Sequence, residues 1–509
     1  MSNAVVAAPA RGRAVWAPAR GRAVWAPVHR ARWTRPRGWT NPAGLAASAL
    51  GAVAAGAMTA VSPRTALTAV IGLAVMGCVY AHPALAGYLI VGLTPLLAGI
   101  DRGQAIPVLR PSEAVAVATG LALITRAVLS ARAGGRRRIQ LNRIEIGFLA
   151  MAVTNSVVPL VWLMAQQKAI TQDDILYALV LWKYLGVYFI IRTSIITHAQ
   201  VLRCLLLSIG SAGVVAVIAI LQSLGLFGIP RLLATYYSPF GYTNLLQNSR
   251  GSSTLALPAA TADLMIYSLA IVSGLWLCAR RYRPVLAPAA ALFVVGALSA
   301  GEFSSAIGLI VGVCCIALVT SYPRLLSLFV PVGALALVVL RPVIARRLSG
   351  FDSVSGLPVS WTGRLQNLRT YFWPQLFSHW NFVLGVRPAA RVPVSAQGTG
   401  YVWIESGYTW LLWGGGIPLL LSFLFFVHAV IGTGWRVARA GTGVPSAAAL
   451  AAFVATVVIC VLMVFDPHLT YRGAAEAFFA LLAMTGIPDR RRESISSENN
   501  AAITLEPAR

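Results

Sequence analysis

Acidic residues are scarce in this chain of 509 residues, which has 15 aspartates and glutamates against 41 lysines and arginines. Charged residues of both signs make up only 11% of the sequence. Soluble domains carry roughly 25% charged residues, so this composition excludes an ordinary soluble protein. Hydrophobic residues reach 58% and the mean hydropathy is +0.74. The sequence therefore predicts an all-α, polytopic membrane protein.

Several motifs of soluble enzymes are also missing. The six cysteines lie within or beside apolar runs without CxxC spacing, so the sequence gives no sign of a disulfide framework. There is no HExxH, GxSxG or P-loop motif, and no cluster of histidine and aspartate with metal-ligand spacing. These absences argue against a metalloenzyme or an ATP-driven pump, and we expect neither a metal nor another cofactor.

The formal net charge of +26 would suggest a nucleic-acid partner in a soluble protein. Here the basic residues lie mostly in short loops and tails between apolar runs, as the positive-inside rule predicts. We therefore expect membrane lipids, and no nucleic acid, as partners of the basic residues. Only Lys168 and Lys183 are lysines, and the remaining cations are arginines, whose planar fork suits phosphate groups.

Runs of apolar residues long enough to span a bilayer recur between a basic tail, residues 1–43, and a second tail, residues 489–509. The first tail contains a tandem repeat, RGRAVWAPA followed by RGRAVWAPV, and is expected to be disordered. We expect about fourteen spans, eleven in residues 44–341 and three in residues 405–488. The expected spans are 44–62, 66–81, 83–100, 113–130, 144–166, 175–193, 200–221, 254–279, 284–300, 303–320, 325–341, 405–432, 446–465 and 472–488.

Alternation from a cytoplasmic first tail places every strong basic cluster on the inside and leaves both termini cytoplasmic. The basic clusters are ARAGGRRRIQLNR (131–143), ARRYR (279–283), WRVARA (435–440) and DRRRE (489–493). The same alternation places residues 342–404 outside. This loop is rich in arginine, tryptophan and phenylalanine, so we expect a folded, helical, amphipathic cap at the membrane surface before the twelfth span.

Ionisable residues near membrane depth are costly and are therefore candidates for function. On the outer side arginines outnumber acids, which favours an anionic ligand such as a diphosphate. The candidates are Arg250, Glu302, Arg364, Arg369, His379, Arg387, Glu405, Asp466, His468 and Arg472.

Each main candidate has a functional and a structural interpretation. Arg250 precedes Gly251-Ser-Ser-Thr, where backbone N–H groups at a helix start could face an anion, but it could equally anchor a helix end. Arg364 has the same two interpretations. Glu302 is either a site residue or the partner of a neighbouring helix end. Glu405, in WIESGYTWLLWGGG, is either a general base or a carboxylate favoured by the dipole of the helix that follows.

Three segments resemble the O-antigen ligase/polymerase superfamily, which are bacterial membrane glycosyltransferases that use lipid-diphosphate-linked glycans. RGSSTLALPAATA (250–262) keeps the arginine and proline of one family segment. GRLQNLRTYFWPQLFSHWNFVLGV (363–386) matches another, and ESGYTWLLWGGG (405–416) matches a third, with Tyr408 at the family spacing. Glu405 stands where ligases often carry histidine.

The resemblance implies transfer or polymerisation of a polyprenyl-diphosphate-linked glycan to a glycan or lipid acceptor outside the cytoplasmic membrane. It implies Glu405 as the catalytic base or acceptor-orienting group, with substrate-binding residues Arg250, Arg364, Arg369, Tyr408 and Glu302. A multi-span transporter or flippase for a lipid-linked or amphipathic substrate is the alternative. A membrane anchor or assembly protein without catalysis is a third possibility.

Overall fold

The computed structural model describes residues 63–486 apart from short gaps at 105, 107–108, 133–140, 238–245, 247–249, 322–323, 349–350, 352–357, 395–399 and 441–442. The basic tail 1–43 with its repeat, the expected span 44–62, most of the basic loop 131–143, the DRRRE cluster and the tail 489–509 lie outside the described residues.

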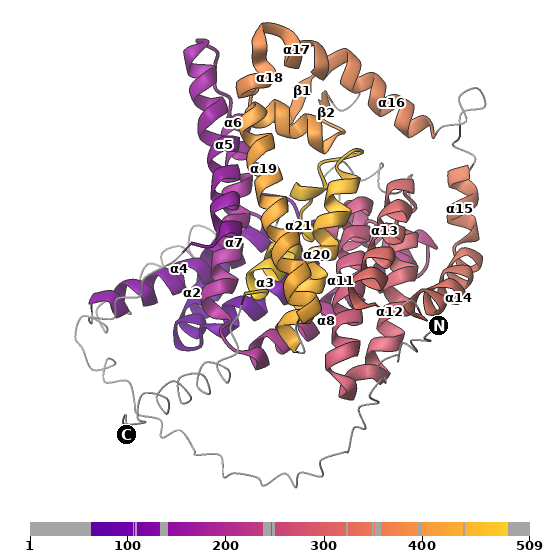
Figure 1. The fold of residues 1–509 in the computed structure, drawn as a ribbon. Coiled ribbons are helices and arrows are strands. Elements are labelled where there is room, and N and C mark those ends of the chain that lie inside the picture. Colours follow the sequence, from indigo (N-terminus) through magenta and orange to yellow (C-terminus); the bar gives the residue numbers. More distant parts are fainter. Residues whose placement is uncertain are drawn as a thin grey trace, which may run out of the picture. The chain divides into compact units, whose positions relative to one another are not determined.

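Between Pro63 and Gly486 the described chain is mainly helical, which confirms the all-α part of the prediction (Figure 1). Nine helical segments of this part are long and apolar enough to cross a membrane. The nine are α4 (Pro111–Arg132), α5 (Arg143–Ala165), α6 with α7 (Gln172–Ser194), α8 (His198–Ser223), α11 (Pro258–Cys278), η2 with α12 (Arg280–Ser299), α13 (Phe303–Thr320), α19 (Gly407–Ala440) and α20 (Val444–Leu462). These helices are those of a multi-pass membrane protein.

Four further helices coincide with expected spans but are shorter or only partly described: α2 (Pro63–Ala81), α3 (Ala84–Leu97), α14 (Arg324–Val339) and α21 (Ala474–Met484). Every expected span after residue 62 thus lies on a helix. A short helix outside these spans, α9 (Ile229–Tyr236), follows α8.

Three boundaries differ from the expectations. The run 175–193 consists of two helices, α6 (Gln172–Ala178) and α7 (Val180–Ser194), which meet at Leu179. The run 254–279 begins as a helix only at Pro258. WRVARA (435–440), expected in a loop, forms the last turns of α19, because Trp435 packs on Phe453 of α20 with ring centroids 5.5 Å apart.

Helix α11 occupies the centre of the bundle, and its side chains from Ala259 to Leu275 are all buried. Close packing depends on small residues. A Cβ on Gly274 would lie 2.6 Å from the Cα of Ala447 in α20, so the two backbones approach as only glycine permits. Elsewhere in the bundle, Phe148 of α5 stacks on Phe479 of α21, with ring centroids 4.3 Å apart. The bundle is therefore close-packed around α11 and α20.

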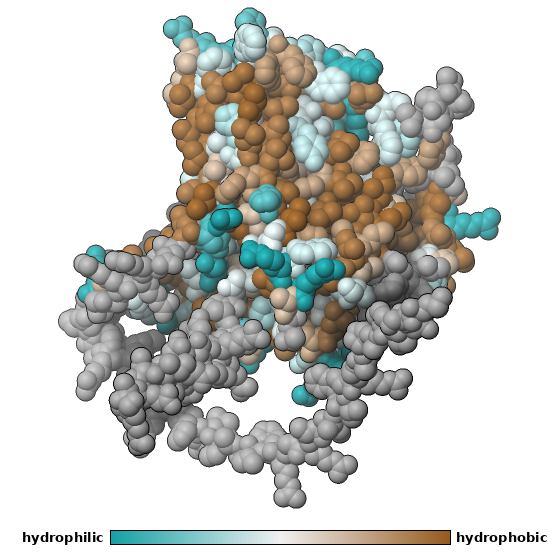
Figure 2. Space-filling view, in the orientation of Figure 1, coloured by the Kyte–Doolittle hydropathy of each residue, from teal (hydrophilic) through white to brown (hydrophobic). Residues whose placement is uncertain are grey.

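The surface of the bundle is apolar over a broad band. Figure 2 shows hydrophobic side chains across most of the face in view, with hydrophilic residues above and below them. Large apolar side chains such as Ile124, Met164, Ile310 and Leu318 are at least 60% exposed, which a soluble protein would avoid. This surface is suited to contact with lipid chains.

Residues 342–404 are called the cap, and its described helices α16 to α18 lie over one end of the bundle, called the cap end (Figure 1). The cap is rich in helix, as expected, and it also contains a two-stranded antiparallel ribbon. Its described elements are α15 (Arg341–Leu348, which begins one residue earlier), α16 (Val359–Asn367), a π-helical turn (Leu368–Phe372), α17 (Trp373–Phe377), a 3-10 turn (Ser378–Trp380), α18 (Asn381–Leu384), β1 (Arg391–Pro393) and β2 (Tyr401–Trp403).

Two ion pairs fasten the cap to the start of α6. Arg387 donates to both carboxylate oxygens of Asp174, at 2.9 and 2.7 Å, and Asp174 is fully buried. Arg391 makes the same two-pronged contact with Asp173, at 2.7 Å for each bond. Bidentate pairs of this kind fix orientation as well as adding energy. The cap is therefore held at a defined position on the bundle.

Glycines let the cap lie directly on α19. Gly416 has a φ of +64° and interrupts the helical backbone inside α19. A Cβ there would lie 2.3 Å from the carbonyl oxygen of Val383 in α18. Gly415 approaches Thr154 of α5 as closely, with its Cβ position 2.4 Å from that carbonyl oxygen. The WGGG sequence is thus the place where α5, α18 and α19 meet.

Candidate functional site

An ionic cluster lies where the cap meets the loop between α20 and α21. Arg364, on α16, forms an ion pair with Asp466 and donates to the carbonyl oxygen of Phe465 at 3.4 Å. Its Nε lies 3.8 Å from Oε1 of Glu405. One guanidinium therefore joins two carboxylates that are 61 positions apart in the sequence.

Glu405 lies two residues before the start of α19, and it does not cap that helix. The capping oxygen belongs to Ser406, whose hydroxyl accepts a hydrogen bond from the backbone N–H of Thr409 at 3.3 Å. Glu405 instead accepts a hydrogen bond from Nδ2 of Asn367 at 3.0 Å, and its side chain is 29% exposed. Glu405 therefore makes no capping hydrogen bond to α19, and its carboxylate is partly exposed within the cluster.

A second pair, Arg250 with Glu302, lies in the same electrostatic neighbourhood. Nη1 of Arg250 is 3.7 Å from Oε1 of Glu302, and the hydroxyl of Ser304 donates to the other carboxylate oxygen at 3.4 Å. Glu302 is close enough to raise the pKa of Asp466 and that of Arg364. Four residues with a predicted role, Arg250, Glu302, Arg364 and Glu405, thus lie in one region together with Asp466. These five residues are called the candidate cluster.

The small polar residues after Arg250 do not surround an anion as expected. Ser252, Ser253 and Thr254 are all buried. The backbone N–H of Ser253 donates to Gln222 of α8 at 2.7 Å, and the hydroxyl of Thr254 donates to the carbonyl oxygen of Pro95 at 2.8 Å. These hydrogen bonds favour the structural interpretation of the segment, because they join it to α3, α8 and α11.

Burial sets the protonation of the cluster. It raises the pKa of Asp466 to about 6, although Arg364 acts in the opposite direction. For Arg364, burial opposes the charged form, but Asp466 and then Glu302 raise its pKa above the ordinary value. The arginine therefore stays charged, while Asp466 changes its charge close to neutral pH.

A buried histidine and aspartate lie next to the candidate cluster. Nδ1 of His468 is 2.7 Å from Oδ2 of Asp263 in α11, and both side chains are only 1% exposed. Burial works against the imidazolium, but the Asp263 carboxylate outweighs it and raises the pKa of His468. Nε2 of His468 and Oδ1 of Asp263 have no hydrogen-bond partner among the described residues. Two buried polar atoms in one pair are thus left without partners.

Sequence reasoning missed Asp263 and Asn367 and did not assign a role to Asp466 or His468. For Asp263 a signal was present, because an acid inside an apolar run is itself a functional candidate. Asn367 gave none, since it is one neutral amide in a polar stretch.

Two predicted substrate-binding residues are not drawn into the candidate cluster. The hydroxyl of Tyr408 donates to the carbonyl oxygen of Cys460 at 2.7 Å, so it joins α19 to α20. Arg369 is exposed on the π-helical turn and has no ion pair with a described residue. Nothing in the structure links either side chain to the other four.

The candidate cluster has groups that can bind an anion and groups that can accept a proton. Two half-buried arginines can bind phosphate oxygens, and a partly exposed carboxylate can accept a proton. Within the described residues, no group of three or more histidines, cysteines and acids is placed to hold a metal ion. Comparison of the chain with protein-family models, curated proteins and solved structures found no match.

Proposed function

We propose that this chain is an integral membrane glycosyltransferase that transfers or polymerises a polyprenyl-diphosphate-linked glycan. The observation that carries the proposal is a pair of arginines at one end of an apolar helical bundle, beside a folded cap: Arg250 faces Glu302, and Arg364 faces the partly exposed Glu405. An anionic leaving group and a hydroxyl nucleophile call for groups of these two kinds. The resemblance of residues 250–262, 363–386 and 405–416 to the O-antigen ligase/polymerase superfamily supports the same reaction.

In the proposed reaction the acceptor hydroxyl oxygen bonds to the anomeric carbon of the donor sugar. The bond from that carbon to the diphosphate oxygen breaks, and the diphosphate leaves with the bonding electrons. Glu405 takes the proton of the hydroxyl. Arg250 and Arg364 stabilise the negative charge that develops on the leaving group. Both arginines already face carboxylates. When the diphosphate binds, each arginine therefore exchanges a carboxylate partner for a phosphate partner.

The proposal includes the topology of the chain. The chain has about fourteen spans, both termini in the cytoplasm, and the cap outside the cytoplasmic membrane. The lipid of the donor lies between spans, and the acceptor is a second glycan or a lipid. No nucleic acid, metal or other cofactor takes part.

One observation favours the alternative, a transporter or flippase. Transporters place ionisable residues within their spans, and Asp263 of α11 forms a fully buried pair with His468. If the pair carries protons for transport, His468→Gln abolishes movement of the substrate across the membrane while no glycosidic bond forms in any variant.

Reconstitution in liposomes with a lipid-diphosphate-linked oligosaccharide tests the proposal directly. We expect glycan transfer by the wild type and a loss of roughly 100-fold or more in Glu405→Gln, because this change keeps an acceptor for Asn367 but removes the base. Arg250→Ala is expected to reduce transfer similarly. Arg231→Ala, an exposed position on α9 at the same end of the bundle, is the matched control. Full activity in the combined Glu405→Gln, Arg250→Ala variant would overturn this site assignment.

A further inference from the structure

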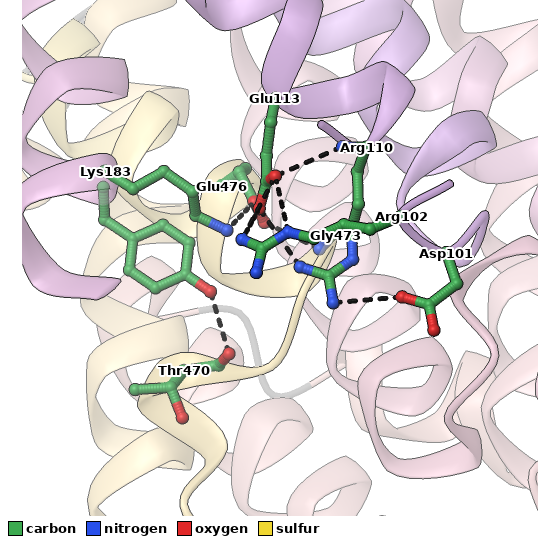
Figure 3. A network of polar contacts seen from close by, with 9 residues as sticks. Asp101, Arg102, Arg110, Glu113, Lys183, Thr470, Gly473 and Glu476 are labelled. Atoms are coloured by element: carbon green, nitrogen blue, oxygen red, sulfur yellow. Dashed lines mark hydrogen bonds and ion pairs between the residues drawn. The ribbon is translucent and has the colours of Figure 1, made fainter. Parts of the chain in front are cut away.

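The loop between α20 and α21, residues 463–473, is anchored at its far end by contacts that do not involve the candidate cluster. Figure 3 shows this end, where the hydroxyl of Tyr184 in α7 donates to the carbonyl oxygen of Thr470 at 2.8 Å. The backbone N–H of Gly473 donates to Glu476, at the start of α21, at 2.7 Å. These contacts hold the last residues of the loop, and its first half is held in another way.

The first half of the loop is held through Asp466 and His468. The backbone N–H of Asp466 donates to the carbonyl oxygen of Leu462, the last residue of α20, at 3.2 Å, and its own carbonyl oxygen accepts from the backbone N–H of His468 at 2.8 Å. The imidazole of His468 reaches α11, where its Nδ1 is 2.7 Å from Oδ2 of Asp263. Asp466 is therefore placed between the end of α20 and a turn that Asp263 fixes to the central helix of the bundle.

The contact between His468 and Asp263 is a costly way to hold a turn. Both side chains are only 1% exposed, and Nε2 of His468 and Oδ1 of Asp263 have no hydrogen-bond partner among the described residues. Replacing a buried ion pair by apolar side chains of similar volume is often neutral or stabilising, and unpartnered buried polar atoms add to the cost. An apolar contact could hold the turn, but it would not place a positive charge beside Asp466.

His468 supplies such a charge. Burial opposes the imidazolium, but the carboxylate paired with it raises the pKa of His468 above the ordinary value. For Asp466, burial raises the pKa, and the charges of Arg364 and His468 lower it. Glu302 and Glu405 also act on Asp466, and both raise its pKa. Two cations thus favour the ionised form of Asp466, one from the cap and one from the loop itself.

We propose that Asp263 and His468 form a positioning pair for the candidate cluster: they fix the turn after α20 so that the carboxylate of Asp466 stays on the guanidinium of Arg364. In the proposed reaction Arg364 stabilises the leaving diphosphate, so the importance of the pair for transfer rests on the proposed function. The position of Asp466 does not rest on it, and this position can be measured without any substrate.

A double-mutant cycle on the titration of Asp466 in the purified full-length protein tests this role. Infrared spectroscopy follows the carboxylic acid band of Asp466, which is identified by its absence in Asp466→Asn. We expect His468→Gln to raise the titration midpoint by about one pH unit or more, because a positive charge is lost and the contact with Arg364 loosens. In the Arg364→Gln background the same change should shift the midpoint by less than about half as much, because no contact is left to loosen.

Tyr184→Phe is the matched control, because it removes an anchor of the same loop at Thr470 and leaves the contact of His468 with α11 intact. This variant should not move the midpoint of Asp466. A variant with both Asp263→Asn and His468→Gln leaves no unpaired charge in α11, so it serves in the same cycle if His468→Gln alone does not fold.

The outcomes separate a positioning role from an effect of charge alone. Equal shifts in the wild-type and Arg364→Gln backgrounds would mean that His468 acts only through its charge, and they would overturn the positioning role. An unchanged midpoint in the His468 variants, or a shift of the same size in Tyr184→Phe, would overturn it as well. Since no transfer reaction is measured, a failure here leaves the assignment of Glu405 untouched, and a failure of that assignment leaves this result standing.

Discussion

Asp466 offers the most direct quantitative test of the candidate cluster. Its carboxyl group is only 9% exposed and is paired with Arg364. Burial nevertheless raises its pKa from the ordinary 3.8 to about 6. At about 1.36 kcal/mol for each pKa unit, this change favours the protonated form by about 3 kcal/mol. The ion pair with Arg364 therefore offsets only part of the desolvation cost.

The sign of the effect on stability follows from the raised pKa. The protonated form of Asp466 is the one that burial favours, so this contribution is fully present below pH 3.8 and is lost as the pH rises through about 6. We expect the free energy of unfolding to fall by about 3 kcal/mol across that window and to level off above it. Asp466→Asn should remove most of this dependence.

Infrared spectroscopy of the purified protein can follow the carboxyl directly. The band of the protonated carboxylic acid, identified by its absence in Asp466→Asn, should titrate with a midpoint near pH 6. In Arg364→Gln the midpoint should rise, because the charge that lowers the pKa is gone. Arg231→Gln should leave it unchanged. A midpoint near the ordinary 3.8, or no response to Arg364→Gln, would refute the burial and pairing described for this residue.

Two further predictions concern the cap. Gly416→Ala should destabilise the fold by about 2 kcal/mol or more, because it combines a φ of +64° with a Cβ position 2.3 Å from the Val383 carbonyl oxygen. Thermal unfolding measures this change. Gly432→Ala, with open space around its Cβ position, is the matched control and should not destabilise the fold, because alanine suits a helix interior better than glycine. Arg387→Ala should cost about 3–5 kcal/mol by leaving the buried Asp174 without its partner, and faster hydrogen exchange confined to residues 381–394 should report it. Unchanged exchange there would mean that this ion pair does not hold the cap.

The sequence predicted part of the candidate cluster because helix ends alternate between two sides of the bundle. Arg250, Glu302, Arg364 and Glu405 each lie at or near a helix end on one side, so counting spans was enough to group them. Arg369 required more, because it lies five residues after Arg364, about 140° further around a helix. The intervening π-helical turn cannot be inferred from the residue types.

Side-chain direction accounts for the remaining differences. Ser252, Ser253 and Thr254 have the composition of an anion-binding turn, but whether they face a ligand or neighbouring helices depends on tertiary packing. Tyr408 was predicted to bind substrate, yet its hydroxyl is directed to the carbonyl oxygen of Cys460. Asp263 meets His468 only because α11 is central and the loop after α20 folds back over its end.

The position of the candidate cluster has one consequence. The cluster belongs to the cap end, where the loop after α20 brings Asp466 to Arg364. A molecule that meets these charges does so from a single compartment. In the proposed reaction, a lipid-linked donor that is made in the opposite compartment therefore has to be turned across the bilayer first, and the released diphosphate stays on the side where it was bound.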